Sequence, residues 1–500
     1  MPWSGSTGQE GSLALPSNEA PVNNEPLSSR FPNLFRANGR MDPIVLILCL
    51  VINVIVLANA ILHYPKIGYD VVQDLNYIQI LPDRLPTAQD TYEFFSPPLP
   101  YFLPSRFDMV CEQYAPDALR TYNGLNYSNT CRLYDGKFAQ GLNVLLSIGT
   151  TILLLLIAEQ IKPGNRFFKI SALTMLALLT VYYKTFSQVR AEPYVVFFTA
   201  LSICLINEIL RTTAISYKLV IATGTSLGLL VLSRQWGFFV FPAIFVLALW
   251  IFLQDRATGW LRTRQFVLIT ILSAIVGGWF YIHLYLDYGT FSAFNIKKPR
   301  YPSLAETVSF FRQTGLRNME LFQAPVRPVF DRQSFFAIIY SETWGDYWGY
   351  FTYIKPGFAS NNTGNHDTMA SYLGSVNLAA TVPSALLLAG LLFGTLQVFL
   401  PRKSPTPERT SFVFLTFFAG STALGYLWFV YRYFIQTNLV IKATYTIQFF
   451  IALLFLFAAF MEVIRKRSPL ACTLILILLG LVFVHNLPAL ITRYSKYFGY

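Results

Sequence analysis

Residues 43–62 read PIVLILCLVINVIVLANAIL, an unbroken apolar run long enough to cross a bilayer as a helix. The rest of the chain has the same character. Of its 500 residues, 54% are hydrophobic and 13% are charged, against about 25% charged in a typical soluble protein. The sequence therefore predicts an all-α polytopic membrane protein.

Further apolar segments predict more membrane spans. They lie at 138–158, 167–183, 194–210, 219–233, 236–253, 266–287, 378–399, 412–431, 445–464 and 469–486. Together with 43–62 they give about eleven transmembrane helices by window length.

The positions of the basic residues predict the orientation. With a cytoplasmic amino terminus, every predicted cytoplasmic connection is basic, as the positive-inside rule requires. The residues concerned are Lys162, Arg166, Lys169, Arg211, Lys218, Arg256, Arg262, Arg264, Arg402, Lys403, Arg409, Arg465, Lys466 and Arg467. Two long loops, 63–137 and 288–377, are then extracytoplasmic. The net charge of +12 is explained by these turns, and no nucleic acid partner is expected.

The two ends of the chain are interpreted separately from this membrane domain, 43–486. Residues 1–42 are rich in Pro, Gly, Ser and Asn, a composition typical of a disordered segment, here a cytoplasmic tail. Residues 487–500 form an extracytoplasmic tail. The run 43–62 is interpreted as a retained signal anchor. Because no retention signal or cleavable leader is recognised, a bacterial plasma membrane is favoured over the endoplasmic reticulum.

Cysteine and histidine residues give little evidence of a metal site. Cys49, Cys204 and Cys472 lie inside apolar runs and are interpreted as packing residues. Cys111 and Cys131 share the first loop, where they either form a disulfide or remain free thiols. The four histidines have no ligand spacing. We therefore expect no cofactor, although the sequence leaves the participation of a divalent metal open.

Acidic residues gather in the first loop, directly after the first span. Apolar residues recur there at helical spacing, at Ile67, Val71, Leu75 and Ile78. This periodicity predicts a short interfacial helix with Asp74 at the edge of the apolar stripe and Asp70 one turn earlier on the polar side. In the second loop, Ser303 and Glu306 have capping-box spacing and predict another helix.

Some basic residues fall on the predicted extracytoplasmic side, against the general rule. They are Lys184, Arg190, Arg234, Arg432 and Lys442. Each can be a snorkelling residue at the interface. Together they can bind a lipid phosphate through charge-assisted hydrogen bonds. A nearby carboxylate is then available as a base toward an incoming hydroxyl or amine.

A series of motifs carries a resemblance to a known family. After the first-loop acid they are EFFSPPLPYFL (93–103), RAEPYVVFF (190–198), LSRQWGFFVFP (232–242), TWGDYWGYF (343–351), YLGSVN (372–377) and IKATYTIQFFIAL (441–453). In this order and sidedness they resemble the GT-C membrane glycosyltransferases, in the branch of protein O-mannosyltransferases and the aminoarabinose transferase of lipid A. The resemblance covers about 43–464.

The resemblance implies transfer of a sugar, with inversion, from a polyprenyl-phosphate donor to an extracytoplasmic glycan, lipid or protein acceptor. It implies that Asp74 is the general base or the residue that orients the acceptor, with Asp70 and Glu93 as rivals. On this interpretation, Asp74→Asn is expected to abolish transfer.

The remaining candidate site residues bind the substrates. Donor-phosphate binding is expected of Arg190, Glu192, Arg234, Arg432, Lys442 and Tyr445. In the second loop, Trp344, Asp346, Tyr347, Trp348 and His366 are expected to contact substrate, whereas the alternative for the aromatic residues is an interfacial belt. The alternative function is a lipid or polysaccharide transporter with a basic outer cavity.

Overall fold

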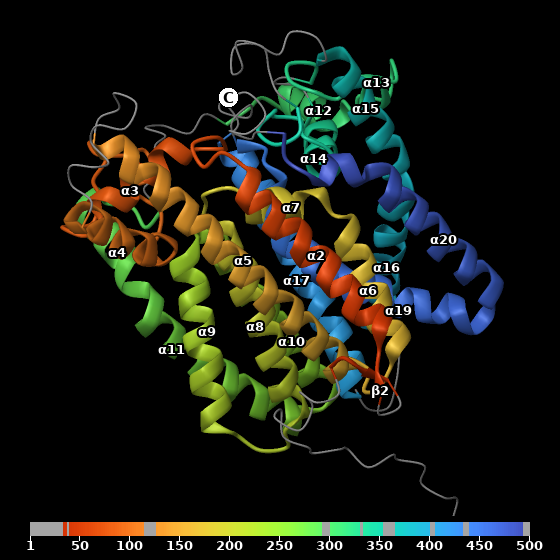
Figure 1. Cartoon of the computed structure of the whole chain (residues 1–500). Helices are drawn as coiled ribbons and strands as arrows, with labels where there is room; N and C mark the ends of the chain where they lie inside the picture. Colours follow the sequence, from red (N-terminus) through yellow and green to blue (C-terminus); the bar gives the residue numbers. More distant parts are fainter. Residues whose placement is uncertain are drawn as a thin grey trace, which may run out of the picture.

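The computed structural model describes residues 34–37, 40–114, 127–292, 301–330, 334–353, 366–400, 406–433 and 440–493. Within these ranges the chain is almost entirely helical, which confirms the predicted all-α fold (Figure 1). The strands found there are the two-residue β1 (Arg36–Ala37) and β2 (Arg40–Met41), which pair antiparallel. Most of the predicted disordered tail lies outside the described residues.

The α-helices follow one another along the whole described chain. They are α2 (Pro43–Leu62), α3 (Val71–Ile80), α4 (Leu99–Tyr114), α5 (Tyr127–Ile161), α6 (Arg166–Leu178), α7 (Thr180–Ser187), α8 (Glu192–Arg211), α9 (Tyr217–Ser233), α10 (Val240–Gln254), α11 (Arg256–Tyr288), α12 (Leu304–Arg312), α13 (Glu320–Gln323), α14 (Phe335–Trp344), α15 (His366–Ala379), α16 (Thr381–Phe399), α17 (Pro407–Arg432), α19 (Ile447–Arg467) and α20 (Pro469–Asn486). Short 3₁₀ helices are η3 (Gln235–Phe239), η5 (Ala443–Thr446) and η6 (Leu487–Leu490).

Among the described residues, 9 helices are long and apolar enough to cross a membrane. The pair α6 and α7 is bent by 67° and would make up to 10 if it forms one span. Helix α9 is apolar but shorter, at 17 residues. Each apolar segment expected from the sequence thus falls on a helix, but the expected count of eleven is not confirmed. The chain is an integral multi-pass membrane protein.

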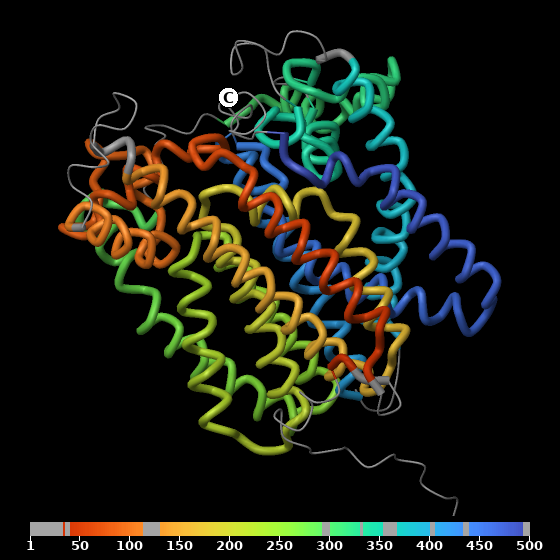
Figure 2. Tube along the Cα trace, in the orientation of Figure 1, coloured from red at the N-terminus to blue at the C-terminus, as the bar shows by residue number. Residues whose placement is uncertain are grey.

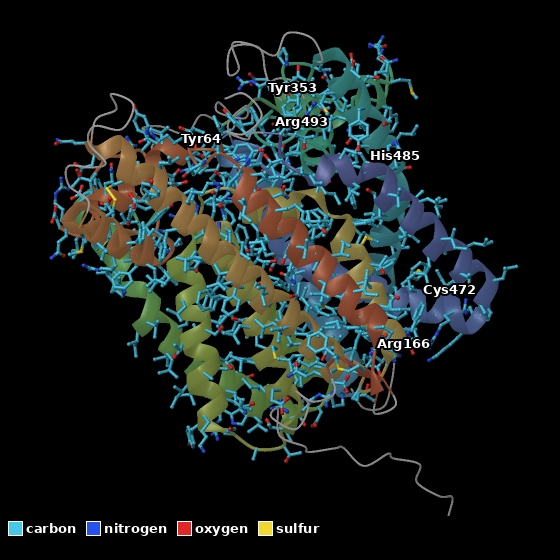
Figure 3. All side chains as sticks on the ribbon, viewed as in Figure 1. Tyr64, Arg166, Tyr353, Cys472, His485 and Arg493 are labelled. Atoms are coloured by element: carbon cyan, nitrogen blue, oxygen red, sulfur yellow. A yellow bond between two sulfur atoms is a disulfide. The ribbon has the colours of Figure 1, made fainter. Side chains whose placement is uncertain are left out.

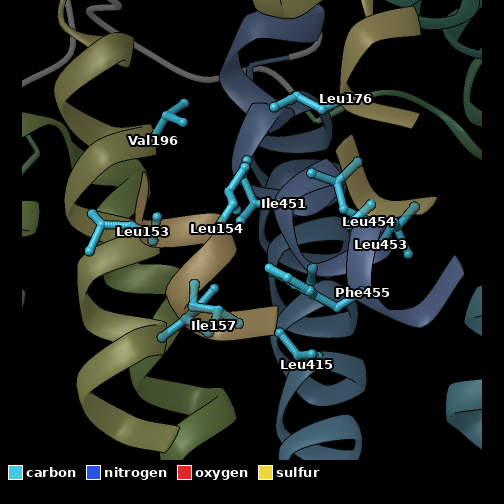
Figure 4. Packing of buried hydrophobic residues seen from close by; sticks show 14 of the residues in the cluster. Leu153, Leu154, Ile157, Leu176, Val196, Leu415, Ile451, Leu453, Leu454 and Phe455 are labelled. Atoms are coloured by element: carbon cyan, nitrogen blue, oxygen red, sulfur yellow. The ribbon is translucent and has the colours of Figure 1, made fainter. Parts of the chain in front are cut away.

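Helix α19 lies at the centre of the bundle, where it packs against α6, α16 and α17. The apolar window of α19 is 72% buried, whereas that of α20 is 22% buried. Figure 4 shows side chains from α5, α6, α17 and α19 interlocking around Leu154, Leu176, Leu415 and Phe455. In Figure 2, α9 and α11 lie on one side of this centre, and α16 and α20 on the other.

Close helix packing on the α9 side depends on small residues. A Cβ added at Gly228 would lie 2.5 Å from Val276 Cβ, and one added at Gly277 would lie 2.6 Å from the Gly228 carbonyl oxygen. Only glycine lets α9 and α11 approach this closely, a common device in membrane helix packing. This contact holds the end of α9, and so Arg234 directly after it, against α11.

The elements of the two long loops lie together at one end of the bundle. Figure 1 shows α3, α4 and α12 to α15 at the end opposite β2. In Figure 3, Tyr64 and Tyr353 lie toward this end and Arg166 toward the other. At the β2 end, Asp42 caps α2 by accepting from the Ile44 amide at 3.0 Å and pairs with Arg166 Nε at 2.5 Å. We call the end that carries the long loops the loop end.

The first loop is anchored to the bundle at several points. The helix expected around Asp74 is confirmed as α3, with Val71, Leu75 and Ile78 buried. Lys137 Nζ donates to the last carbonyls around the end of α2, at Ala60, Ile61 and His63, within 2.8–2.9 Å, which satisfies groups that a helix end leaves unpaired. Cys111 and Cys131 form a disulfide between α4 and α5, which resolves the alternative left open by the sequence.

The second loop contains short helices rather than one long segment. Ser303 and Glu306 form the expected capping box at the start of α12, which ends at Arg312. Leu304 and Val308 on α12 are exposed, as an interfacial helix requires. After α13, Glu342 lies on α14, and Trp348 follows the end of α14 by four residues. Trp348 Nε1 donates to the Ile441 carbonyl at 2.8 Å.

Candidate active site

An ion pair between Asp70 and Lys442 joins the first loop to the segment before α19. Asp70 is the N-cap residue of α3 and has φ 56° and ψ 8°, a left-handed conformation that aspartate adopts more readily than most residues. Its side chain is 40% exposed, whereas that of Lys442 is 8% exposed. Partial loss of hydration disfavours the charged carboxylate, but the positive charge of the Lys442 ammonium outweighs this effect and lowers the pKa of Asp70. Asp70 is therefore an ionised carboxylate that reaches solvent.

A second set of ion pairs lies beside the first. Arg234 Nη1 donates to Glu93 Oε2 at 2.7 Å, and Arg234 Nε lies 3.6 Å from Glu192 Oε1. Arg190 Nε donates to Glu192 Oε2 at 2.7 Å. Ser96 completes this junction, because it donates to Glu93 and accepts from Arg234. All of these residues are buried, so the structure brings the first-loop acid Glu93 and two of the predicted outer cations, Arg190 and Arg234, into one cluster.

Two tyrosine rings lie against the cations of this cluster. Arg190 Cζ is 5.0 Å from the ring centroid of Tyr69 and 5.8 Å from that of Tyr445. Lys442 Nζ is 5.2 Å and 5.3 Å from the same two centroids and donates to Tyr445 Oη at 3.2 Å. These distances are within the range of cation–π attraction. Tyr445 thus lies where its motif placed it, beside Lys442.

Asp74 lies deeper than Asp70. It is 3% exposed and accepts a hydrogen bond from Tyr101 Oη at 2.7 Å. Burial and the negative charge of Glu93 raise its pKa well above the usual value of an aspartate, and Arg234 and the hydrogen bond from Tyr101 offset this only in part. The net effect of its surroundings therefore favours the protonated form of Asp74.

The second-loop candidates have a different environment. Trp344, Tyr347 and Trp348 are each at most 2% exposed, so they do not form an exposed belt in this structure. Asp346 accepts from the backbone amides of Tyr350, Phe351, Thr352 and Tyr353 at 2.7–3.2 Å and organises the turn of its own motif. Substrate contact by these residues stays a prediction.

Two other predicted site residues, Arg432 and His366, are not part of the cluster described above. Arg432 ends α17, and its Cζ lies 4.9 Å from the ring centroid of Tyr301. None of the described contacts of Arg432 is with a residue of the charged cluster. His366 begins α15, but its side chain lies outside the described part of the chain.

An apolar groove of about 620 Å³ opens next to the cluster. Its walls come from η3, α11 and α17 and include Trp236, Phe238, Phe239, Tyr281, Trp428 and Phe429. Trp236 follows Arg234 by two residues, and its ring centroid is 4.9 Å from that of Tyr445. The groove and the charged cluster thus share a wall.

Comparison with known proteins finds a family model that matches part of the chain. Residues 127–287 match the family model described as dolichyl-phosphate-mannose-protein mannosyltransferase. The predicted resemblance to GT-C glycosyltransferases is confirmed. Arg190, Glu192 and Arg234 lie inside the matched segment, whereas Asp70, Glu93 and Lys442 lie outside it. No curated protein matches the chain.

Solved structures with low sequence identity are also similar to the chain. One is ArnT from Cupriavidus metallidurans in the apo state, with 12% identity, a TM-score of 0.37 and coverage of 85% of this chain and 79% of that one. The same protein bound to undecaprenyl phosphate has 12% identity, a TM-score of 0.35 and coverage of 85% of this chain and 79% of that one. An oligosaccharyltransferase from Archaeoglobus fulgidus, tethered to an acceptor peptide, has 12% identity, a TM-score of 0.45 and coverage of 89% of this chain and 54% of that one.

Two tyrosines that bond acidic side chains, Tyr69 and Tyr101, were not identified from the sequence. Tyr69 Oη donates to Glu342, 273 residues away, and Tyr101 Oη donates to Asp74, 27 residues away, and a buried tyrosine has no distinguishing pattern. The Glu342 carboxylate accepts from Tyr69 Oη and from Lys184 Nζ, and the Lys184 ammonium also donates to the Glu342 carbonyl at 2.6 Å. Among the described residues, no group of three or more His, Cys, Asp or Glu side chains is arranged to hold a metal ion.

Proposed function

We propose that this GT-C-like protein transfers a sugar from a polyprenyl-phosphate donor to a hydroxyl or amine acceptor at its loop end. The observation that carries the proposal is the gathering of Arg190, Arg234 and Lys442 beside an ionised, accessible Asp70 and an apolar groove. A phosphate group needs such cations, and a prenyl chain needs an apolar surface out of water. The family named in the match, for dolichyl-phosphate-mannose, supports the same donor class.

We assign the general base to Asp70 rather than to Asp74. A base must be ionised and must reach the proton it removes. Asp70 has a lowered pKa and a 40% exposed side chain. Asp74 has a raised pKa, is 3% exposed and is already bonded to Tyr101. The role of Asp74 is then to support α3, and the expected loss of transfer moves to Asp70.

The chemical step follows from this assignment. Asp70 removes the proton from the acceptor, whose oxygen or nitrogen attacks the anomeric carbon of the donor sugar. The bond from that carbon to the phosphate oxygen breaks, and the polyprenyl phosphate leaves as an anion held by the cations. Attack on the face opposite the leaving group inverts the anomeric centre.

The charges of the cluster balance before the donor arrives. Asp70, Glu93 and Glu192 face Lys442, Arg190 and Arg234 in four ion pairs. A bound phosphate adds negative charge and so competes with a carboxylate for a cation. Asp70 is the exposed member of these pairs. We infer that phosphate binding to Lys442 releases Asp70 to act on the acceptor.

The proposed orientation places the active site outside the cytoplasm. It rests on the basic residues predicted to be cytoplasmic, such as Arg166, and on their distance from the loop end (Figure 3). Whether the membrane is bacterial, as proposed from the sequence, or belongs to the endoplasmic reticulum does not alter this geometry.

The deciding experiment uses the purified full-length chain in detergent, where transport across a membrane cannot occur. The protein is mixed with polyprenyl-phosphate sugars and with glycolipid and peptide acceptors, and the products are identified by mass spectrometry. Glycosylated product from the wild type, lost in Asp70→Asn, supports the proposal. Binding of polyprenyl phosphate without any transfer across a panel of sugars and acceptors would favour the transporter.

A further inference from the structure

We propose that Tyr69 is a positioning residue that holds the two phosphate-binding cations and the base in their relative places. The inference rests on the proposed function, because it assigns Tyr69 a role at that site. Tyr69 itself is 5% exposed and acts through Arg190, Lys442 and the neighbouring Asp70.

The ring of Tyr69 is a platform shared by the two cations. Arg190 and Lys442 come from distant parts of the chain, yet their charged groups lie 5.0 Å and 5.2 Å from the same ring centroid. The two like charges repel each other, and each is attracted by the negative face of an aromatic ring. Removing the ring therefore removes an attraction that both cations share.

The hydroxyl of Tyr69 fixes the ring to the second loop. It donates to Glu342, which also accepts from Lys184 of α7. Both side chains of this ion pair are at most 3% exposed. The second carboxylate oxygen of Glu342 accepts from the Trp348 amide at 3.3 Å, and Trp348 bonds the backbone just before Lys442. The anchor is thus buried and is held from three elements.

The base follows Tyr69 directly in the chain. Asp70 has a left-handed backbone, which is unfavourable in a non-glycine residue and persists only where the surroundings enforce it. The buried Tyr69 side chain before Asp70 and α3 after it supply that enforcement. Loosening Tyr69 is therefore expected to disturb the placement of the Asp70 carboxylate more than the stability of the bundle.

Two substitutions separate the ring from the hydroxyl. Tyr69→Phe keeps the platform and removes the anchor, so it is expected to lower kcat about tenfold and to change the affinity for polyprenyl phosphate less than about threefold. Tyr69→Leu removes both, and it is expected to weaken polyprenyl phosphate binding about tenfold as well, as the loss of cation–π contacts implies. Binding is measured with dolichyl phosphate and undecaprenyl phosphate, and turnover with the sugar-loaded donor.

The matched control is Tyr182→Phe. Tyr182 is also buried, and its hydroxyl bonds Ser147 Oγ at 2.9 Å within the helix bundle. This variant removes a buried phenol hydroxyl away from the site, so kcat and binding are expected to stay within twofold of wild type. Thermal unfolding of all variants shows whether the Tyr69 substitutions act through stability alone.

A double-mutant cycle tests the anchor itself. If Glu342 acts through Tyr69, then Tyr69→Phe combined with Glu342→Gln lowers kcat no further than the larger single effect. Additive losses, or unaltered kcat and binding in both Tyr69 variants, would overturn the inference. If Tyr69→Leu does not fold, Tyr69→Phe and the cycle decide. A wild-type protein that neither binds polyprenyl phosphate nor transfers sugar would instead refute the proposed function.

Discussion

Lys442 and Asp70 form an ion pair although they lie 372 residues apart in the sequence. The pair links the acidic first loop to the segment that opens the central helix α19. Only Asp70 of the two is substantially exposed. A ligand that enters from the loop end therefore reaches the Asp70 carboxylate first. It reaches the buried Lys442 ammonium only by displacing that carboxylate.

Asp70→Asn and Asp74→Asn are predicted to differ. The first removes the proposed base and should lower kcat by about 10²–10⁴-fold, the usual contribution of general base catalysis. The second replaces a carboxyl whose surroundings favour the neutral form, so most of the activity should remain. Initial rates are compared at equal amounts of purified protein. The reverse order of effects would return the base to Asp74.

The pH dependence of stability should reveal the state of Asp74. Its folded pKa is raised, so the folded protein holds this proton more tightly than the unfolded chain. Stability from this group is present below the ordinary aspartate pKa and is lost as pH rises toward the raised pKa. Asp74→Asn should remove this fall in melting temperature. If Asp74→Asn leaves the dependence of melting temperature on pH unchanged, Asp74 is ionised in the folded protein.

Lys442→Met is predicted to move the acid limb of the kcat/KM profile to higher pH. Lys442 lowers the pKa of Asp70, so that its stabilising pair exists above the ordinary aspartate pKa and is lost as pH falls through the lowered value. Without the cation the carboxylate takes up its proton at higher pH. Lys162→Met, which breaks a pair with Glu408 at 2.6 Å, is the control and should leave the limb in place.

Arg234→Met should destabilise the fold by about 3–5 kcal/mol, because it leaves the buried Glu93 carboxylate without its cation. Glu192 also loses its longer contact with Arg234 but keeps its ion pair with Arg190. Arg84→Met removes an exposed pair with Asp90 and should have a much smaller effect, since solvent screens such pairs. Unfolding in detergent is followed by tryptophan fluorescence. Equal effects of the two variants would contradict a buried charge cluster.

Phe238→Asp should raise KM for long-chain polyprenyl donors several-fold, because it puts a charge into the apolar groove. A water-soluble short-chain donor does not fill the groove, so its KM should change little. Kinetics with both donors on the same preparation give the comparison. An equal rise for both would place the prenyl chain elsewhere.

The sequence by itself determined the features that depend on neighbouring residues. Apolar windows predicted the helices of the bundle, because a bilayer span needs an apolar run of fixed length. Periodicity predicted α3, and the spacing of Ser303 and Glu306 predicted the start of α12. The sequence also singled out Asp70, Glu93, Arg190, Arg234 and Lys442, which meet at the loop end, together with Arg432, which does not join them.

The tertiary structure decided which of these residues meet. Asp70 and Asp74 lie one turn apart, and only packing left one exposed beside Lys442 and buried the other beside Tyr101. The pairing of Arg234 with Glu93 spans 141 residues, and Tyr69 acquires its cations from two distant segments. Such contacts depend on how helices pack, which no local pattern encodes. For that reason the sequence predicted a site of acids and cations, and only the fold decided which of them lie in contact.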